Sequence, residues 1–253
     1  MNKTIDLKNY KLDTFIKDLN QFGISLEEKQ LIQFIQYYEL LMEWNRFMNL
    51  TAITEYEEVL KKHFIDSLSI INILKYEELS TKSISVIDIG TGAGFPGIPL
   101  KIVFPNLQVT LLDSLQKRVN FLQAVIDELS LSDIRVVHGR AEEYASEGKG
   151  KYREQFDLCV SRAVANLSTL SEYCLPYIKV GGAFISYKSD KMEDEYIQAK
   201  RAIELLGGKK KKKASFTIPG TDISRTLLLI GKVNKTPVKF PRKAGLPSKE
   251  PLN

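Results

Sequence analysis

The sequence predicts an α/β protein in which a small N-terminal helical layer precedes a mostly parallel sheet that ends in an antiparallel hairpin. Three observations lead to this prediction. Residues 8–78 show helical periodicity, and no glycine interrupts the chain between Ile24 and Ile89. From Ser83 onward, short β-rich runs alternate with helical stretches. Near the C-terminal end, two β-rich runs are separated by only about one turn, which is the spacing of a hairpin.

The helical layer is predicted in two segments. Apolar side chains recur three or four residues apart at Leu31, Ile35, Tyr38 and Met42. Ser25 is a suitable N-cap for this helix, and Glu27 and Glu28 in its first turn favour the helix dipole. A second helix is expected over residues 55–74, "EYEEVLKKHFIDSLSIINIL". Residues 1–80 are therefore assigned to an N-terminal helical region.

The alternating part of the chain predicts βαβ units. The expected strands cover residues 84–89, 107–112, 134–138, 156–161 and 183–188. Helical stretches such as residues 114–129 lie between them, and right-handed crossovers of this kind build a mostly parallel sheet. The closing runs at residues 214–220 and 225–233 form a hairpin, so the last strand is antiparallel. This strand order is typical of the Rossmann-like sheet of class I S-adenosylmethionine-dependent methyltransferases, and the domain is expected to span residues 81–235.

Charge is distributed unevenly along the 253 residues. The net charge is +5, yet residues 201–253 hold thirteen Lys and Arg against three Asp and Glu. A basic C-terminal region on a mildly acidic body favours a polyanionic partner. The run Lys209–Lys213 has a second interpretation, a solvated loop that aids solubility. Residues 236–253 form a basic tail with prolines, which is expected to be extended and to be mobile when free.

The composition also disfavours several classes of protein. No apolar run approaches the roughly 18 residues of a membrane span, and the N-terminus has no apolar segment of a signal peptide. Two Cys and two His argue against a Cys/His zinc site, and no metal is expected. Cys159 and Cys174 lie in apolar runs, which favours a reducing cytoplasm over a disulfide scaffold. We expect a cytoplasmic monomer that binds no membrane.

The segment "ISVIDIGTGAGFPGIPL", residues 84–100, joins a predicted strand to a helix through a glycine-rich turn. Gly90, Gly92 and Gly94 permit positive φ angles and a close approach of a ligand to the backbone. Asp113, at the end of the next strand and 21 residues after Gly92, can accept hydrogen bonds from two ribose hydroxyls. These features suit both NAD and S-adenosylmethionine, and a lone G-x-G-x-x-G is a weak signal.

Three details favour S-adenosylmethionine over a dinucleotide. Asp88, the next-to-last residue of the strand, would repel a pyrophosphate but suits an α-amino group and a sulfonium. Phe95 and Pro96 lie inside the literal G-x-G-x-x-G, where bulk and a missing N–H are poor for a pyrophosphate. The third detail is the terminal hairpin, which a dinucleotide-binding half-sheet does not need.

Several motifs together resemble one family. "DIGTGAGFPGIPLKIVFPNLQVTLLDSLQKRVNFL" is similar to the RsmG (GidB) family, the bacterial methyltransferases that act on guanine N7 of 16S ribosomal RNA. The segments "WNRFMNLTAI", "HFIDSL", "GRAEEY", "FDLCVSRAVANL" and "PRKAGLPSKEPL" resemble its other motifs, so the likeness runs from about residue 30 to the C-terminal end. Two positions depart from the usual pattern: Ala141-Glu142 is a common variant pair, and Ser189 replaces a frequent glycine.

The resemblance implies S-adenosylmethionine as cofactor and 16S ribosomal RNA, or the small ribosomal subunit, as partner. The cofactor residues that it implies are Gly90, Phe95, Ala141, Glu142 and Arg162. Most of them also have a structural interpretation. Glu142 could be an acid that favours a helix N-terminus, and Phe95 could pack in the core. Asp88 and Asp113 could cap their turns.

Three basic residues are expected at the catalytic edge of the sheet. Arg162 ends a central strand that reads as buried, and arginine is seldom fully buried without a partner. Arg140 and Lys188 also lie at strand ends on this edge, so the three would form a cationic rim for RNA phosphates or for the target nucleotide. A salt bridge is the alternative for Arg162, and a solvated charge for the other two. His63 and Asp66 are expected to pack or to face the substrate rather than to catalyse.

Missing motifs narrow the reaction further. The fourth strand is followed by "SRAVANL" and not by [DN]-P-P-[YFW], which disfavours methylation of exocyclic amines. Neither cysteine is placed like the nucleophile of a cytosine-C5 enzyme. Guanine N7 has an in-plane lone pair and no proton, so direct transfer needs positioning and no general base. Three alternatives stay open: a NAD-dependent oxidoreductase, a non-catalytic RNA-binding module and a small-molecule methyltransferase.

Overall fold

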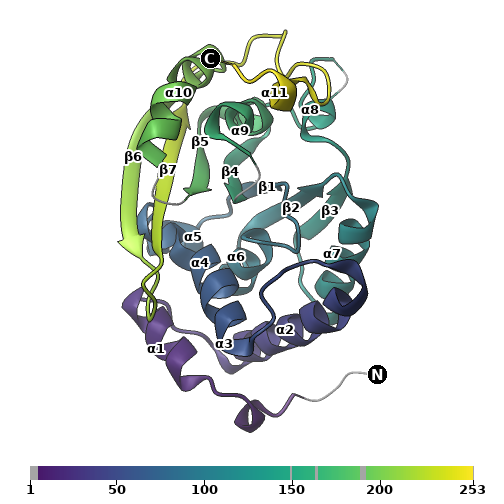
Figure 1. The fold of residues 1–253 in the computed structure, drawn as a ribbon, viewed down its shortest axis with the longest axis vertical. Helices are drawn as coiled ribbons and strands as arrows, with labels where there is room; N and C mark the ends of the chain where they lie inside the picture. Colours follow the sequence, from purple (N-terminus) through teal and green to yellow (C-terminus); the bar gives the residue numbers. More distant parts are fainter. Residues whose placement is uncertain (1–4, 149, 163–164, 189–191, 253) are drawn as a thin grey trace.

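The structure, a computed structural model, describes residues 5–148, 150–162, 165–188 and 192–252. A seven-stranded sheet crosses the molecule with the strand order β3-β2-β1-β4-β5-β7-β6 (Figure 1). Its strands are β1 (Ser85–Ile89), β2 (Gln108–Asp113), β3 (Ile134–His138), β4 (Phe156–Arg162), β5 (Ile178–Lys188), β6 (Gly208–Thr217) and β7 (Ser224–Lys232). Strands β1 to β5 pair in parallel, whereas β7 is antiparallel to both β5 and β6. The predicted mixed sheet with its terminal hairpin is confirmed.

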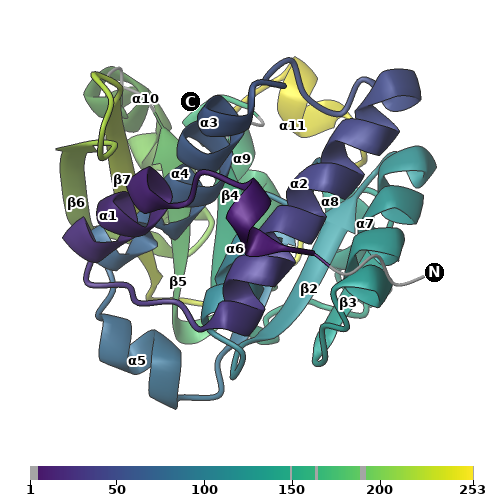
Figure 2. The ribbon, with the colours of Figure 1, turned by 90° about the horizontal axis from the view of Figure 1, so that it is seen from below.

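Helices cover both faces of this sheet. They are α1 (Asp13–Gln21), α2 (Glu28–Met48), α3 (Tyr56–Val59), α4 (Asp66–Leu68), α5 (Tyr76–Thr81), α6 (Gly97–Val103), α7 (Gln116–Glu128), α8 (Ala141–Tyr144), α9 (Leu167–Cys174), α10 (Met192–Leu205) and α11 (Leu246–Lys249). Short turns of other types are η1 (Leu7–Asn9), the π-helical η2 (Leu60–Ile65), η3 (Ser69–Asn72) and η4 (Leu175–Tyr177). Figure 2 shows the long helix α2 lying across α6 and α7.

Two apolar clusters fill the space between the sheet and its helices. The first packs the N-terminal layer, α6 and α7 against one face and includes the fully buried Phe34, Phe64 and Leu111. The second packs α9 and α10 against the other face and includes Cys159 and Phe184. Burying one such large side chain contributes about 1.5–3 kcal/mol. Because the N-terminal helices share a core with the sheet, the side chains that they carry toward its carboxyl edge are held in fixed positions.

The helical layer differs from the prediction in two details. Ser25 is not the N-cap of α2, because Glu27 occupies that position and forms a capping box with Gln30. The Gln30 side chain accepts a hydrogen bond from Glu27 N–H at 2.9 Å, a reciprocal arrangement that Ser25 cannot make. The second predicted helix runs without a break over residues 56–72, but it is not a single α-helix: α3, the π-helical η2, α4 and the 3-10 turn η3 follow one another directly.

The hairpin begins earlier than predicted, and β5 is longer. β6 starts at Gly208 and so includes Lys209–Lys213, which makes the loop interpretation of this run wrong. β6 is an edge strand, and exposed edges often carry lysines because the charges discourage pairing with another chain. Lys210 and Lys213 lie 3.2 and 2.8 Å from the carboxylate of Glu193 on α10. Low β-propensity hid the first half of this strand from the sequence pattern.

The C-terminal tail is packed rather than extended. Phe240 is buried, and α11 forms near the end of the tail, beside α8 and α9 (Figure 1). The Arg242 side chain donates two parallel hydrogen bonds to Glu172, Nε to Oε1 at 3.0 Å and Nη2 to Oε2 at 2.7 Å. Glu172 is fully buried on α9, and a buried carboxylate needs a charged partner. The boundaries at residues 80 and 235 stay a prediction.

Three general features bear on function. Within the described ranges, no helix combines the length and the apolar character needed to cross a bilayer. The same part of the chain gathers no group of three or more His, Cys, Asp or Glu side chains that could hold a metal ion. Cys159 and Cys174 are free and buried.

Candidate active site

Two adjoining cavities open where the strand order reverses, at the carboxyl ends of β1 and β4. Open α/β sheets bind their ligands at this position. The first, the glycine-turn cavity, has a volume of about 220 Å³ and is lined by Ile89, Gly90, Leu112, Asp113, Ser114, Gly139, Arg140, Ala141, Glu142, Ala165, Tyr173 and Ser248. The second, the arginine cavity, has a volume of about 700 Å³ and is lined by Ile53, Lys62, His63, Asp66, Arg162, Ala165, Asn166, Tyr187, Lys188, Glu195 and Arg225. Ala165 lines both, so the two cavities share a boundary.

The turn between β1 and α6 depends on its glycines and on Asp88. The glycines with positive φ are Gly90 (68°), Gly92 (64°) and Gly94 (98°). Glycine enters this region without a steric penalty. Asp88 Oδ2 accepts hydrogen bonds from Thr91 Oγ1 at 2.7 Å and from Gly97 N–H at 2.9 Å. The carboxylate therefore ties the end of the strand to the start of the following helix.

Several N–H groups of this turn are already used inside the protein. Gly97 N–H donates to Asp88, and Gly92 N–H donates to Asp113 Oδ2 at 2.9 Å. Gly94 N–H donates to a backbone carbonyl. A pyrophosphate needs free N–H donors and no anion among them. The turn is therefore poorly built for a dinucleotide, in agreement with the argument from the sequence.

The turn uses only one of the two carboxylate oxygens of Asp88. Its side chain is fully buried, and Oδ1 has no hydrogen-bond partner among the described residues. Burial raises the pKa of Asp88 from 3.8 to about 6, although the hydrogen bonds from Thr91 and Gly97 lower it. An unsatisfied buried acceptor costs about 1–3 kcal/mol. The negative charge of this carboxylate would therefore favour a positively charged group bound near the turn.

Two carboxylates flank the glycine-turn cavity. Asp113, at the end of β2, is 2% exposed and accepts from Gly92 N–H. Glu142, in the first turn of α8, accepts a 2.7 Å hydrogen bond from Gly245 N–H. Both carboxylates thus have a structural partner while they line the cavity. The bond to Gly245 also brings the C-terminal tail to the cavity, where Ser248 joins the lining.

Arg140 and Ala141 lie at the start of α8. Arg140 is the exposed N-cap residue, and Ala141 is buried. Both line the glycine-turn cavity. Arg140 therefore lies at the glycine-turn cavity, whereas the other two residues of the predicted cationic rim line the arginine cavity.

Arg162 lines the arginine cavity and belongs to an ion-pair triad. Its Nη1 lies 2.9 Å from Asp66 Oδ2, and Arg225 Nε lies 3.0 Å from Asp66 Oδ1. The Asp66 side chain is 2% exposed, so both of its oxygens are committed to guanidinium groups. The salt bridge proposed as an alternative for Arg162 is present, and it fixes the side chain in the cavity wall.

Phe95 lies behind the cavities rather than in their walls. Its ring stacks on His63 with centroids 4.5 Å apart, and the Arg162 guanidinium lies 5.0 Å from the ring centroid. Tyr37 packs against the same ring, and a Cβ on Gly94 would lie 2.6 Å from Tyr37 Oη. Burial, followed by the charge of Arg162, lowers the pKa of His63 from 6.5 to about 3, so the imidazole stays neutral. Phe95 thereby connects the N-terminal layer to the glycine turn.

Lys188 ends β5 and lines the arginine cavity. Its Nζ lies 2.8 Å from Glu195 Oε2 and also donates to Ala165 O. Glu195, on α10, accepts a second hydrogen bond from Leu167 N–H at 3.1 Å. The pair therefore joins the ends of β5, α9 and α10. Ser189, the other position singled out in this turn, lies outside the described residues.

The predicted residues fall into two groups and a supporting set. Five of them line the glycine-turn cavity: Gly90, Asp113, Arg140, Ala141 and Glu142. Arg162 and Lys188 line the arginine cavity. The remainder, which shape the turn without being among the lining residues, are Asp88, Gly92, Gly94 and Phe95. Two residues of the arginine cavity, Arg225 and Glu195, are not predicted from the sequence. Arg225 has no local signal, because its partner is 159 residues away, whereas an acid in the first turn of α10 could have indicated Glu195.

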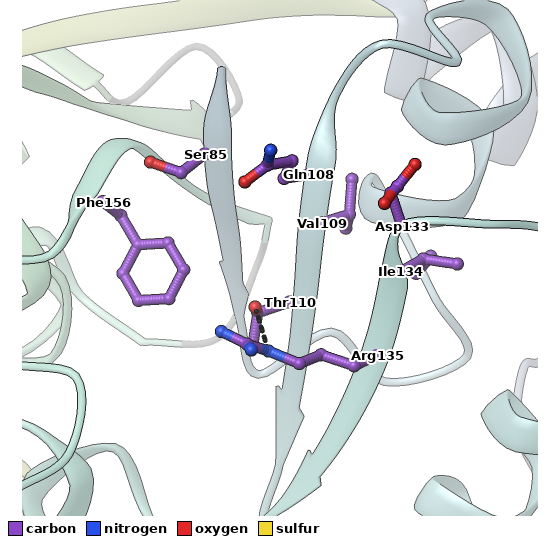
Figure 3. Close-up of a pocket in the computed structure, with 8 residues that line it drawn as sticks. All are labelled: Ser85, Gln108, Val109, Thr110, Asp133, Ile134, Arg135 and Phe156. Atoms are coloured by element: carbon purple, nitrogen blue, oxygen red, sulfur yellow. Dashed lines mark hydrogen bonds between the residues drawn. The ribbon is translucent and has the colours of Figure 1, made fainter. Parts of the chain in front are cut away.

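A third cavity, of about 260 Å³, lies away from these residues. It is lined by the first residues of four strands and their neighbours: Ser85, Gln108, Val109, Thr110, Asp133, Ile134, Arg135 and Phe156. Arg135 Nε donates to Thr110 Oγ1 at 3.0 Å (Figure 3). This third cavity lies at the amino ends of the strands, opposite the edge where α/β sheets bind ligands, and none of the predicted site residues lines it.

Comparisons with known proteins show which family this chain belongs to. A family model described as rRNA small subunit methyltransferase G (GidB) matches residues 30–224. Ribosomal RNA small subunit methyltransferase G of Lachnoclostridium phytofermentans is 55% identical over 239 residues, which cover 94% of this chain and 96% of that protein. The protein of the same name from Acetivibrio thermocellus is 50% identical over 249 residues, covering 98% and 100%. Among solved structures, M. jannaschii TYW2 in complex with AdoMet matches with a TM-score of 0.53 at 14% identity, over 72% of this chain and 80% of that one, which supports the fold alone.

The family match spans both the glycine turn and the ion-pair triad, apart from Arg225 at its border. The chain belongs to the GidB family of methyltransferases, described as rRNA small subunit methyltransferase G.

Proposed function

We propose that this protein transfers a methyl group from S-adenosylmethionine to N7 of a guanine in 16S ribosomal RNA. One observation carries the proposal: two cavities of different chemistry adjoin at Ala165, at the switch point of the sheet. One carries the glycine turn and the acids of a nucleoside-binding site. The other carries an excess of basic side chains, which suits a nucleotide of RNA.

The residues of the glycine-turn cavity fit S-adenosylmethionine. Asp113 would accept from the ribose hydroxyls, while Ala141 and Glu142 would border the adenine. The buried carboxylate of Asp88, which lies behind the glycine turn and lines neither cavity, would offset the positive charges of the α-amino group and the sulfonium from a distance. When bound, S-adenosylmethionine supplies an electrophilic methyl group, and the electron pair of the broken carbon–sulfur bond stays on the sulfur.

The chemistry requires no proton transfer by the protein. Guanine N7 has a lone pair in the ring plane and carries no proton, so a bond to carbon can form directly. Two acid–base groups of the arginine cavity agree with this: burial lowers the pKa of His63 to about 3, and both oxygens of Asp66 are held by arginines. The protein would act by positioning and by fixed positive charge. The target nucleotide has to leave its stack to reach the cavity.

The test is methyl transfer from isotope-labelled S-adenosylmethionine to small ribosomal subunits that lack the modification, followed by nucleoside analysis and mapping. N7-methylguanosine in the small-subunit RNA is the expected product. Label on another base would contradict the proposed target atom. Label on a small metabolite in place of RNA would contradict the proposed substrate class.

We also infer that the protein works as a cytoplasmic monomer without a metal. The buried free thiols Cys159 and Cys174 are compatible with a reducing compartment. Sedimentation at micromolar concentration tests the oligomeric state, and full activity after chelator treatment tests the absence of a metal. A stable dimer or a loss of activity with chelator would contradict the respective inference.

A further inference from the structure

Both basic and acidic side chains line the arginine cavity. Its basic side chains are Lys62, Arg162, Lys188 and Arg225, and its carboxylates are Asp66 and Glu195. Each oxygen of Asp66 is bonded to a guanidinium and its side chain is 2% exposed, so a substrate has little access to it. Glu195 differs: only its Oε2 has partners among the described residues, and its side chain is 29% exposed. Glu195 is therefore the carboxylate that can still accept hydrogen bonds from a substrate.

The position of Glu195 is as informative as its free oxygen. Its partner Lys188 donates to the carbonyl of Ala165, the residue that lines both cavities. The Lys188–Glu195 pair thus lies beside the boundary that a methyl group would cross. Arg162 and Arg225 form another part of the cavity wall, held together by Asp66, and their remaining N–H groups suit a phosphate.

Methylation at N7 restricts which parts of guanine the protein can hold. N7 has to face the methyl donor, so recognition must use the remaining polar atoms: the O6 acceptor and the N1–H and N2–H₂ donors. A carboxylate can accept both of these donors, and an ammonium can donate to O6. Adenine presents the reverse pattern at these positions, an amino donor at C6 and an acceptor at N1. A side-by-side ammonium and carboxylate therefore discriminate guanine from adenine.

We propose that the Lys188–Glu195 pair reads the Watson–Crick edge of the target guanine, with Glu195 as the residue that determines base specificity. This inference rests on the proposed function and goes beyond it by naming the recognition group. Glu195 Oε1 would accept from N1–H and N2–H₂, and Lys188 Nζ would donate to O6. The hydrogen bond from Leu167 N–H and the salt bridge to Lys188 hold the carboxylate in place before the base arrives.

The alternative is that the pair only fastens α10 to β5 and α9. A substrate that lacks one donor separates the two roles. Small subunits are reconstituted with inosine at the mapped target position, which removes the N2 amino group and keeps N7, O6 and N1–H. The kcat/KM for transfer is then measured on guanosine and inosine subunits with the wild-type protein, with Glu195→Gln and with the control Glu204→Gln, an exposed acid on the same helix.

The wild-type protein and the Glu204→Gln control are expected to prefer guanosine over inosine by about 5- to 150-fold. Glu195→Gln is expected to lower kcat/KM on guanosine by a similar factor and to remove most of the preference. The ratio is measured on one preparation, so a partly unfolded variant does not distort it. An unchanged guanosine-to-inosine ratio in Glu195→Gln would overturn the inference and leave the proposed function intact. A wild-type protein that leaves guanosine subunits without N7-methylguanosine would overturn both.

Discussion

The glycine-turn cavity and the arginine cavity share a boundary, but different interactions hold them in shape. In the first, Asp88 and Asp113 accept hydrogen bonds from backbone N–H groups of the glycine turn. The donor residues lie nine residues from Asp88 and 21 residues from Asp113 in the chain. In the second, Asp66 holds Arg162 and Arg225, which are 96 and 159 residues away. The turn of the first cavity is a local backbone conformation, although a hydrogen bond from the C-terminal tail also closes its rim. The wall of the second cavity depends on ion pairs that exist only when the whole chain is folded. The cofactor side should therefore survive changes in the ion pairs, while the substrate side should not.

The largest effect is expected when the ion-pair triad is broken. Asp66→Asn removes the charge that Arg162 and Arg225 share, and loss of one partner of a buried pair costs about 3–5 kcal/mol. Urea unfolding should show this loss, and methyl transfer should collapse while the protein still binds S-adenosylmethionine. Asp222→Asn, at an exposed position in the hairpin, is the control and should change stability by no more than about 0.5 kcal/mol. Equal loss of cofactor binding and transfer in Asp66→Asn would show that the cavities are not independent.

A methyl group in the glycine turn should have the next largest effect. In Gly94→Ala the new Cβ would lie 2.5 Å from Ile98 Cδ1 and 2.6 Å from Tyr37 Oη, at a φ of +98°. Overpacking costs about 1–3 kcal/mol, and the unfavourable φ adds about 1–2 kcal/mol. Gly23→Ala is the control, because its φ is +68° but no atom lies within 4 Å of the new Cβ. Calorimetry should show weaker cofactor binding in Gly94→Ala alone, and similar losses of stability in both variants would refute the steric argument.

The pH dependence of stability tests the buried acid of the turn. The folded-state pKa of Asp88 is about 6 and its ordinary value is 3.8, so between these values the folded protein holds a proton that the unfolded chain has released. The stabilising contribution is complete below pH 3.8 and is lost as pH rises to about 6, by about 2–3 kcal/mol. The unfolding free energy of the wild-type protein relative to Asp88→Asn should therefore fall between about pH 4 and pH 7. If the difference in unfolding free energy between the two proteins did not change with pH, burial would not raise the pKa of Asp88.

The smallest effect is expected on the edge strand β6. Lys209 and Lys211 are exposed there, whereas Lys210 and Lys213 share the carboxylate of Glu193. If the strand contacts RNA phosphates, replacing Lys209 and Lys211 by alanine should weaken RNA binding and reduce the slope of log affinity against log salt by about 1 for each lost contact. The Lys210/Lys213 double variant is the comparison and should change the slope less. Identical slopes in all proteins would show that these lysines do not contact RNA, and would leave protection of the exposed edge strand as their role.

The same difference between the cavities decides what the sequence could predict. Asp88, the turn glycines and Asp113 lie within one βαβ unit, so their spacing predicts both the turn and its position on the sheet. Arg162 and Lys188 were found because they end predicted strands. The ion-pair partners could not be assigned, because no local pattern connects Asp66 with Arg225 across 159 residues.

Two errors have the same physical origin. The lysines of β6 have low strand propensity, and only pairing with β7 makes them part of the sheet. The tail looks unstructured by composition, yet Arg242 is held by the buried carboxylate of Glu172, 70 residues earlier. In both regions tertiary contacts override local preference.

The most direct test of the two-cavity account is the S-adenosylmethionine dissociation constant of a matched pair of variants, one from each cavity. Asp113→Asn alters the glycine-turn cavity, and Arg225→Gln alters the arginine cavity. Calorimetry is expected to find weaker cofactor binding by about 10-fold or more in Asp113→Asn, since hydrogen bonds to charged groups contribute about 1.5–3 kcal/mol. Arg225→Gln is expected to keep an unchanged dissociation constant and to have a lower kcat/KM for small subunits. Equal weakening of cofactor binding in both variants would contradict the division of cofactor and substrate between the two cavities.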